Sequence, residues 1–457
     1  MPDQRTNSLK YVKNNKERFL EKLKEVVAIP SVSTASEHEG DIQKAAEWLK
    51  EELLVLGIEN VKIYPTPRHP LVYGDWLKAG PNAPTALIYG HYDVQPETPL
   101  DKWNTEPFSP TIKGENIYGR GTTDMKGQII ATLAAVDAIL QAGEFPLNIK
   151  FLIEGEEEIG GPNLENFIAT HTDLLACDFA LNPDTGMLAP DTPTITYALR
   201  GLAYFDLRID GPKQDLHSGL FGGVVHNPAQ VLAELIAGMH DAQGRVTLPG
   251  FYDRVALLED EERAELARLP LNEEFYLQES GSPALWGEEG FTPAERTGAR
   301  PTLEINGLYS GFIEKGSKTV LPAYAIAKIS TRLVPKQDPS EVGEQLRAYL
   351  TDNAPPTVTW ELVQTAGGVA SISDRKSPWI QAYIEAAESA WGTRPLFKRE
   401  GGSVPVVVHF QELLSVDTVN IGFGLPGDNM HGPNEKLHLP TFYTGIEALV
   451  HFFFNLE

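Results

Sequence analysis

The chain has one cysteine, few basic residues and no long apolar run. Of its 457 residues only Cys177 is a cysteine, so no internal disulfide can form, which is typical of proteins from a reducing compartment. Cys177 lies in an apolar run with no cationic neighbour, which favours a structural thiol over a nucleophile. No window approaches the roughly 18 apolar residues of a membrane-spanning helix, so we expect no membrane span.

Acidic residues far outnumber basic ones. The 63 Asp and Glu residues exceed the 38 Lys and Arg residues and give a formal net charge of −25. Such a surface repels phosphate groups, so we expect neither nucleic acid nor an anionic membrane as a partner. The polar N-terminal segment lacks the apolar core of a secretory signal. These features together predict a cytoplasmic protein.

The first part of the chain reads as alternating helices and strands. Apolar spacing predicts helices over residues 19–27 and 42–56, and an apolar helix over 127–142. Short β-rich runs at 85–89 and 147–153 are bounded by Gly and Pro and predict buried strands. Strands that alternate with helices at this spacing predict an α/β sheet covered on both faces.

The pattern changes near residue 191. Strand-like runs at 194–200, 203–209, 325–331 and 358–363, with helices at 228–239 and 339–349, predict an α+β domain. A charged, irregular stretch spans about 240–300, and the α/β pattern resumes after about 371 and ends in an apolar helix at 441–454. Because the chain exceeds the usual size of one core, we predict an α/β domain in two parts, 1–192 and 371–457, interrupted by an α+β domain at 193–370.

Five residues of the metal-ligand type stand in separate, distinctive local sequences. One carboxylate that bridges two ions, with one imidazole and one carboxylate for each ion, is the ligand set of a two-metal hydrolase. A mixture of His and carboxylate ligands suits zinc, manganese or a similar divalent ion. The candidates are His91 in GHYDVQP, Asp124 in GRGTTDMKG, Glu158 in EGEEEIG, Asp184 in LNPDTG and His431 in DNMHGPNEKL.

Each of these local sequences also has a structural interpretation. His91 and Asp93 stand two apart at a predicted strand end, where Asp93 could orient the His91 ring or simply occupy a turn. Asp124 could be a helix N-cap. The run Glu156–Glu158 could be a solvated loop, or two adjacent Glu residues could divide the work, so that one binds metal and its neighbour handles protons.

Motifs of other enzyme classes are incomplete or absent. Residues 422–427 match GxGxxG, but Pro426 and the polar segment that follows do not begin a dinucleotide-binding helix. The chain has no GxxxxGK[ST] phosphate loop, and Ser403 does not lie in a GxSxG elbow. Nucleotide-binding and serine-hydrolase readings are therefore disfavoured.

Taken in order, the motifs resemble the M20 metallopeptidase family, and most closely its cytosolic nonspecific dipeptidase/carnosinase branch. The resemblance spans nearly the whole chain, through IPSVS (29–33), GHYDVQP, EPFSP (106–110), GRGTTDMKG, EGEEEIG, DLHSGLFGG (215–223), STRLVP (330–335), REGGS (399–403) and HGPNEKL. It implies an α/β catalytic domain of the two-metal exopeptidase type, with a mixed sheet flanked by helices. It also implies that the inserted α+β domain is a lid that forms a homodimer.

The resemblance also implies a role for each matching residue. His91 and Asp184 would hold one ion, Glu158 and His431 the other, and Asp124 would bridge them. Asp93 would orient His91, and Glu157 would act as general base and then acid, although the extra Glu156 leaves the register of this pair open by one. In the lid, His217 would stabilise the oxyanion in the partner subunit's site, and Thr319, Arg332 and Ser403 would contact substrate.

The implied reaction is hydrolysis of dipeptides or short peptides with a free C-terminal carboxylate by metal-bound hydroxide. Two divalent ions per subunit are expected: zinc, with manganese or cobalt as alternatives. One departure concerns substrate preference, because the chain has Lys376-Ser-Pro-Trp379 where the dipeptidase branch carries a His ahead of the helix. The alternatives are an N-acyl-amino-acid deacylase of the same family and a metal-stabilised peptide-binding protein without turnover.

Overall fold

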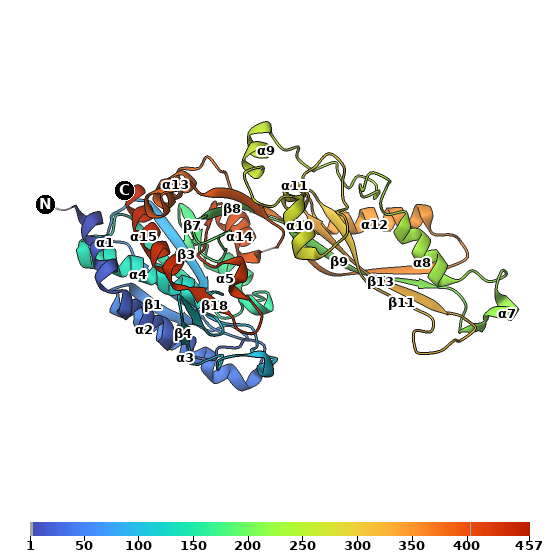
Figure 1. Ribbon diagram of the computed structural model, residues 1–457, viewed down its shortest axis with the longest axis horizontal. Coiled ribbons are helices and arrows are strands. Elements are labelled where there is room, and N and C mark those ends of the chain that lie inside the picture. Colours follow the sequence, from blue (N-terminus) through green and yellow to red (C-terminus); the bar gives the residue numbers. More distant parts are fainter. Residues whose placement is uncertain (1–2, 403) are drawn as a thin grey trace. The chain divides into compact units, whose positions relative to one another are not determined.

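A computed structural model describes residues 3–402 and 404–457, and the chain forms two compact units (Figure 1). The first contains the chain up to Tyr197, Ser373–Phe397 and Pro405–Glu457, and the second contains Ala198–Ile372 and Lys398–Val404. From the sequence we predicted the inserted domain at 193–370 and residues 398–404 in the α/β domain. That segment groups with the second unit, and the boundary between the units crosses both β16 (Leu396–Glu400) and its neighbour β8 (Thr194–Leu199).

The first unit is built on a six-stranded mixed sheet in the order β1-β2-β6-β3-β7-β17. Strands β6, β3, β7 and β17 run parallel, whereas β1 and β2 form an antiparallel edge. The strands are β1 (Glu59–Tyr64), β2 (Leu71–Trp76), β3 (Thr85–His91), β6 (Asn148–Glu154), β7 (Phe179–Asn182) and β17 (Thr418–Asn420). Every residue of β6 is buried, as expected for a central strand covered on both faces.

Helix α4 (Lys126–Ala142) lies at the centre of the helical layer. It packs against β3 and is in turn contacted by α1 (Gln4–Asn14), α2 (Lys16–Val27) and α15 (Leu439–Asn455). Residues 126–139 of α4 are all buried, because other helices cover the side that turns away from the sheet. α3 (Glu39–Val55) packs on β1 and β2, and α13 (Pro378–Trp391) packs on α15.

The second unit contains a four-stranded antiparallel sheet in the order β11-β13-β9-β14. Its strands are β9 (Gly201–Asp210), β11 (Thr302–Ser310), β13 (Tyr324–Leu333) and β14 (Thr359–Gly368). Strand β9 alternates strictly between buried and half-buried residues, so one face of the sheet supplies the core. α8 (Pro228–Ala237) and α12 (Pro339–Asn353) contact the sheet and contribute their apolar residues to that core.

These observations confirm the predicted fold class, an α/β domain interrupted by an α+β domain. The stretch at 240–300 is less irregular than we expected, since it contains α9 (Asp260–Leu266), α10 (Glu273–Ser280) and α11 (Pro293–Gly298). α11 begins with a capping box between Thr292 and Glu295, which lets a short helix form without a long apolar face. Among the described residues, no helix is both long and apolar enough to cross a bilayer.

Candidate metal centre

The carboxyl ends of three parallel strands carry candidate ligands. His91 is the last residue of β3, Asp184 follows β7, and Glu158 follows β6 after a short turn. Because β3 lies between β6 and β7, their carboxyl ends meet at one edge of the sheet, where ligands bind in open α/β folds. The His91 Nε2 atom lies 3.8 Å from the Asp184 Oδ2 atom.

Asp124 occupies the middle of the site. It lies in the loop before α4, and its two carboxylate oxygens face different histidines. Oδ1 lies 3.1 Å from His91 Nε2, and Oδ2 lies 2.9 Å from His431 Nε2. His431 Nε2 is in turn 3.3 Å from Glu158 Oε2.

The five candidates therefore form two groups of three that share Asp124. One group is His91, Asp124 and Asp184, and the other is Asp124, Glu158 and His431. In each group one ligand atom per residue lies within 4.8 Å of the others. Asp124 is the one residue that the two groups share, which is the place that the family resemblance implies for a bridging carboxylate.

Asp93 contacts both sides of the site, but not only as we expected. The His91 Nδ1 atom lies 3.0 Å from the backbone carbonyl of Asp93 and 3.5 Å from its carboxylate. That carboxylate instead accepts hydrogen bonds from the backbone N–H groups of Glu157 and Glu158, at 3.2 and 3.1 Å. Asp93 thus contacts the His91 ring and also hydrogen-bonds the turn that carries the two glutamates.

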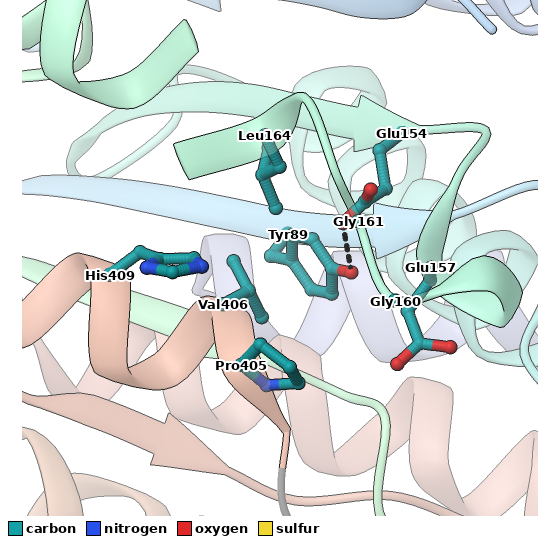
Figure 2. Close-up of a pocket in the computed structure, with 9 residues that line it drawn as sticks. All are labelled: Tyr89, Glu154, Glu157, Gly160, Gly161, Leu164, Pro405, Val406 and His409. Carbon is teal, nitrogen blue, oxygen red and sulfur yellow. Dashed lines mark hydrogen bonds between the residues drawn. The ribbon is translucent and has the colours of Figure 1, made fainter. Parts of the chain in front are cut away.

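The three adjacent glutamates occupy different environments. The Glu156 carboxylate is buried and accepts hydrogen bonds from Thr66 Oγ1, the His69 backbone and the Asn163 side chain and backbone. Glu158 joins a ligand group, and Glu157 lines a pocket with Tyr89 and Glu154 (Figure 2). Among the described residues, no hydrogen bond to the Glu157 carboxylate is found, which distinguishes it from the carboxylates of Glu156 and Glu158.

The site contains more acidic than basic side chains, namely three carboxylates and two imidazoles. Burial, followed by the charge of Asp124, raises the pKa of Glu158 to about 8, and burial also raises the pKa of Asp184 and of Glu157. A hydrogen bond to Asp124 raises the pKa of His431 to about 9. Buried carboxylates of this kind need cations to be stable in their charged form. The donor set, three carboxylates and two imidazoles, fits two divalent ions.

The remaining predicted residues belong to the second unit or fall outside the described chain. Exposed His217 lies in β10 (Leu216–His217), which pairs with β12 (Val320–Leu321) in a register that sets His217 opposite Val320. Exposed Thr319 immediately precedes β12, and its carbonyl accepts a hydrogen bond from the backbone of Ser218. Arg332 is half-buried near the end of β13. The predicted substrate contact Ser403 lies outside the described residues.

Two contacts at the site were not predicted from the sequence. The Gln95 side chain donates a hydrogen bond of 2.7 Å to Glu158 Oε2. Arg120 and Glu435 form a buried ion pair beside Asp124. Arg120 lies in the motif GRGTTD and Glu435 in the motif HGPNE, both quoted above. No spacing rule pairs two residues so far apart in the chain.

Comparison with known proteins agrees with this geometry. Residues 87–455 match peptidase family M20/M25/M40. A Cys-Gly metallodipeptidase (DUG1) of Candida albicans is 32% identical, over 95% of this chain and 93% of the relative. The Beta-Ala-His dipeptidase of Homo sapiens is 31% identical, over 98% of this chain and 91% of the relative.

Solved structures of M20 family proteins are also similar to this chain. An M20 family metallo-carboxypeptidase from Sulfolobus solfataricus, Sso-CP2, superposes with a TM-score of 0.81 at 34% identity, covering 95% of this chain and 98% of that one. Human carnosine dipeptidase 1 superposes with a TM-score of 0.78 at 30% identity, covering 100% of this chain and 99% of that one. The chain therefore belongs to peptidase family M20/M25/M40, which confirms the family that its motifs resemble.

Proposed function

We propose that this protein is a metal-dependent dipeptidase that hydrolyses dipeptides or short peptides with a free C-terminal carboxylate. The observation that carries the proposal is the pair of ligand groups that share Asp124, with the free carboxylate of Glu157 nearby. The named relatives above 30% identity, a Cys-Gly metallodipeptidase and a Beta-Ala-His dipeptidase, support the same substrate class.

Five side chains would hold two divalent ions. His91 and Asp184 would bind one ion, Glu158 and His431 the other, and Asp124 both. When bound, such ions polarise the scissile carbonyl and make water acidic enough to act as a nucleophile near neutral pH. Zinc is our first candidate, with manganese and cobalt as alternatives, because imidazole and carboxylate ligands suit all three.

Glu157 would move the protons. Its carboxylate would accept a proton from the attacking water and then deliver it to the nitrogen of the leaving amine. Burial raises the pKa of Glu157 and so brings it nearer to neutral pH, where one group can serve both steps. Asp93 would keep Glu157 in place through the backbone of the turn.

The second unit would supply the groups that recognise substrate. Arg332 would bind the C-terminal carboxylate, for which its planar guanidinium offers two parallel donors. Thr319 would make a further contact, and His217 would stabilise the oxyanion of a partner subunit's active site. We propose in addition that Ser403 contacts substrate, that the protein is a homodimer assembled through its second unit, and that it acts in the cytoplasm.

Two other functions use the same residues. An N-acyl-amino-acid deacylase would need the same metal centre, but the dipeptidase names of the relatives favour peptide substrates. A metal-stabilised peptide-binding protein would have no use for a free, part-buried carboxylate at Glu157, so this reading is disfavoured too.

A hydrolysis panel tests the proposal. The purified protein, stripped of metal and reloaded with Zn²⁺, Mn²⁺ or Co²⁺, is offered Cys-Gly, β-Ala-His, other dipeptides and N-acetyl-amino acids. We expect turnover of dipeptides and little turnover of N-acetyl-amino acids. The reverse preference would identify a deacylase, and binding of peptides without turnover under every metal would identify a binding protein.

A further inference from the structure

A buried ion pair lies directly behind the ligand loops. Arg120 Nη1 and Glu435 Oε2 are 2.8 Å apart, and their side chains are only 1% and 0% exposed. Neither residue belongs to the two ligand groups. Burying an ion pair carries a large desolvation cost, so its presence beside the site calls for a reason other than general stability.

Glu435 holds the backbone of the loop that ends at Asp124. Its Oε2 atom accepts a hydrogen bond of 2.9 Å from the N–H of Gly121, in addition to the contact with Arg120. Its Oε1 atom accepts hydrogen bonds from the N–H groups of Thr123, at 2.9 Å, and of Asp124 itself, at 3.2 Å. One carboxylate therefore fixes three backbone donors within four residues of the bridging ligand.

Arg120 connects this loop to the two loops on the other side of the site. Its Nη2 atom donates to the carbonyl of Gly432, at 3.2 Å, and to the carbonyl of Pro96, at 3.1 Å. Gly432 follows His431, and Pro96 follows Gln95, which hydrogen-bonds Glu158. The guanidinium thus bonds the residue that follows His431 and the residue that follows Gln95. His431 belongs to the ligand group of Asp124, Glu158 and His431, and Gln95 bonds Glu158 of the same group.

The loop that carries His431 needs such support. His431 itself has a φ of 59°, a left-handed conformation that is unfavourable for a residue with a side chain. Asn429 and Asn434, in the same loop, have φ values of 55° and 63°. A loop of this kind keeps one shape only when surrounding contacts determine it, and the bond from Arg120 to Gly432 is one of them.

We propose that Glu435 and Arg120 are positioning residues of the metal centre, which hold Asp124 and His431 at the separation that one ion requires. The inference rests on the proposed binding of metal by these two ligands. Glu435 acts through the backbone of the Asp124 loop, and Arg120 through the backbone of the His431 loop. Neither residue is a member of the two ligand groups, so neither would be a ligand itself.

The test is the metal affinity of Glu435→Gln. Glutamine keeps the shape of the side chain but has only one acceptor oxygen, so one pair of donors loses its partner. Zn²⁺ and Mn²⁺ affinities of the metal-free protein are measured by competition with a chromophoric chelator. We expect a loss of 10- to 100-fold, on the order found for residues that support metal ligands, and a smaller rise of Tm on adding metal.

The Arg300–Glu288 pair of the second unit gives a matched control. It is also a buried Arg–Glu ion pair, at 2.7 Å, with side chains that are 7% and 6% exposed. Glu288→Gln should leave metal affinity within about twofold of the wild type. If Glu288→Gln and Glu435→Gln weaken metal binding equally, the effect is one of general stability and the proposal is wrong.

Arg120→Lys covers the case in which Glu435→Gln does not fold. It keeps the positive charge beside Glu435 but cannot donate to two carbonyls and a carboxylate with one planar group. Weakened metal affinity in a folded Arg120→Lys protein supports the proposal. Wild-type affinity in either folded variant, or unfolding of both variants in the presence of metal, would overturn it. Wild-type protein that binds no metal at all would instead refute the proposed function.

Discussion

At the scale of single residues, the three adjacent glutamates differ in their contacts. Glu156 is engaged by Thr66, His69 and Asn163, Glu158 faces His431, and Glu157 lines the pocket of Figure 2. The sequence leaves the register of this run open by one position. The contacts favour Glu157 and Glu158 as the pair that divides proton transfer and metal binding.

We expect Glu157→Ala and Glu158→Ala to fail in different ways. Glu157→Ala should keep both metals and lose roughly 10²–10⁴ in kcat, because one group serves as base and as acid. Glu158→Ala should lose metal. Metal analysis of the purified variants, together with kcat at saturating metal, separates the two. If Glu157→Ala loses metal and Glu158→Ala keeps it, the register is wrong by one.

Titration of two ligands predicts how the metal-free protein responds to pH. The pKa of Glu158 is raised to about 8, so the folded metal-free protein binds more protons than the unfolded chain and loses stability as pH rises toward 8. The pKa of His431 is raised to about 9, so its contribution is complete below about 6.5 and is lost as pH rises through 9. Titration of Glu158 and titration of His431 therefore both lower the stability of the metal-free protein as pH rises.

We therefore expect the Tm of the chelator-treated protein to fall between pH 6 and pH 9. The metal-loaded protein should show a smaller fall, because bound cations take the place of the protons. Asp124 contributes nothing to this change, since its pKa is lowered and it stays ionised throughout. Thermal unfolding at pH 6, 7.5 and 9 measures the difference, and equal falls with and without metal would contradict it.

Among the elements, α4 lies next to Asp124 and constrains the loop that carries it. The helix begins two residues after this ligand, and Gly127 stands at its second position. A Cβ atom at Gly127 would lie 2.2 Å from the carbonyl oxygen of Thr122 and 2.6 Å from the Leu437 side chain. Any side chain at position 127 would therefore clash with the loop that carries Asp124, and only glycine fits there.

Gly127→Ala and Gly40→Ala form a matched pair. Gly40 is the second residue of α3, and a Cβ atom there would have no neighbour within 4 Å. Gly40→Ala should stabilise the protein by about 0.5–1 kcal/mol, because alanine is the better helix former. Gly127→Ala should destabilise it by about 1–3 kcal/mol or more through overpacking. Denaturant unfolding of the metal-free proteins measures both, and equal effects would contradict the account.

At the scale of the whole molecule, the second unit exposes several large apolar side chains. Leu220 and Val224, close in sequence to His217, are 75% and 84% exposed. Leu308, on the edge strand β11, and Ile313 are 63% and 74% exposed. On a protein with a net charge of −25, these side chains are good candidates for a surface that a second copy covers.

Mixing two inactive variants tests the proposed exchange of His217 between subunits. Loss of one oxyanion donor costs about 10²–10³ in kcat, so His217→Ala should be nearly inactive and keep its metal. In a hybrid with Glu157→Ala, one active site would combine an intact Glu157 with an intact His217 from the neighbour. We expect activity to return in part once the subunits exchange.

Labelled subunits establish whether exchange has taken place. A mixture that stays inactive despite proven exchange would exclude the role of His217 in the partner subunit's site. A wild-type protein that is monomeric and fully active would exclude it as well.

The sequence was sufficient for the main buried elements and for the family. Apolar periodicity predicted the buried helix at 127–142 and the strands at 85–89 and 147–153, which the structure shows as α4, β3 and β6. Ordered motifs identified the family, and the family match confirms it. His91, Asp124 and His431 could be nominated because each stands in a distinctive local sequence.

Only the tertiary structure decided which atoms meet. The order of strands β6, β3 and β7 brings Glu158, His91 and Asp184 to one edge, although no sequence spacing encodes that order. Arg120 and Glu435 lie 315 residues apart, and a buried ion pair at that separation has no local signature. Asp93 illustrates the same limit, since the sequence indicated its contact with His91 but not its hold on the Glu157 and Glu158 backbone. Periodicity and motifs report what a residue is and which face it occupies, whereas its partners depend on how distant segments pack.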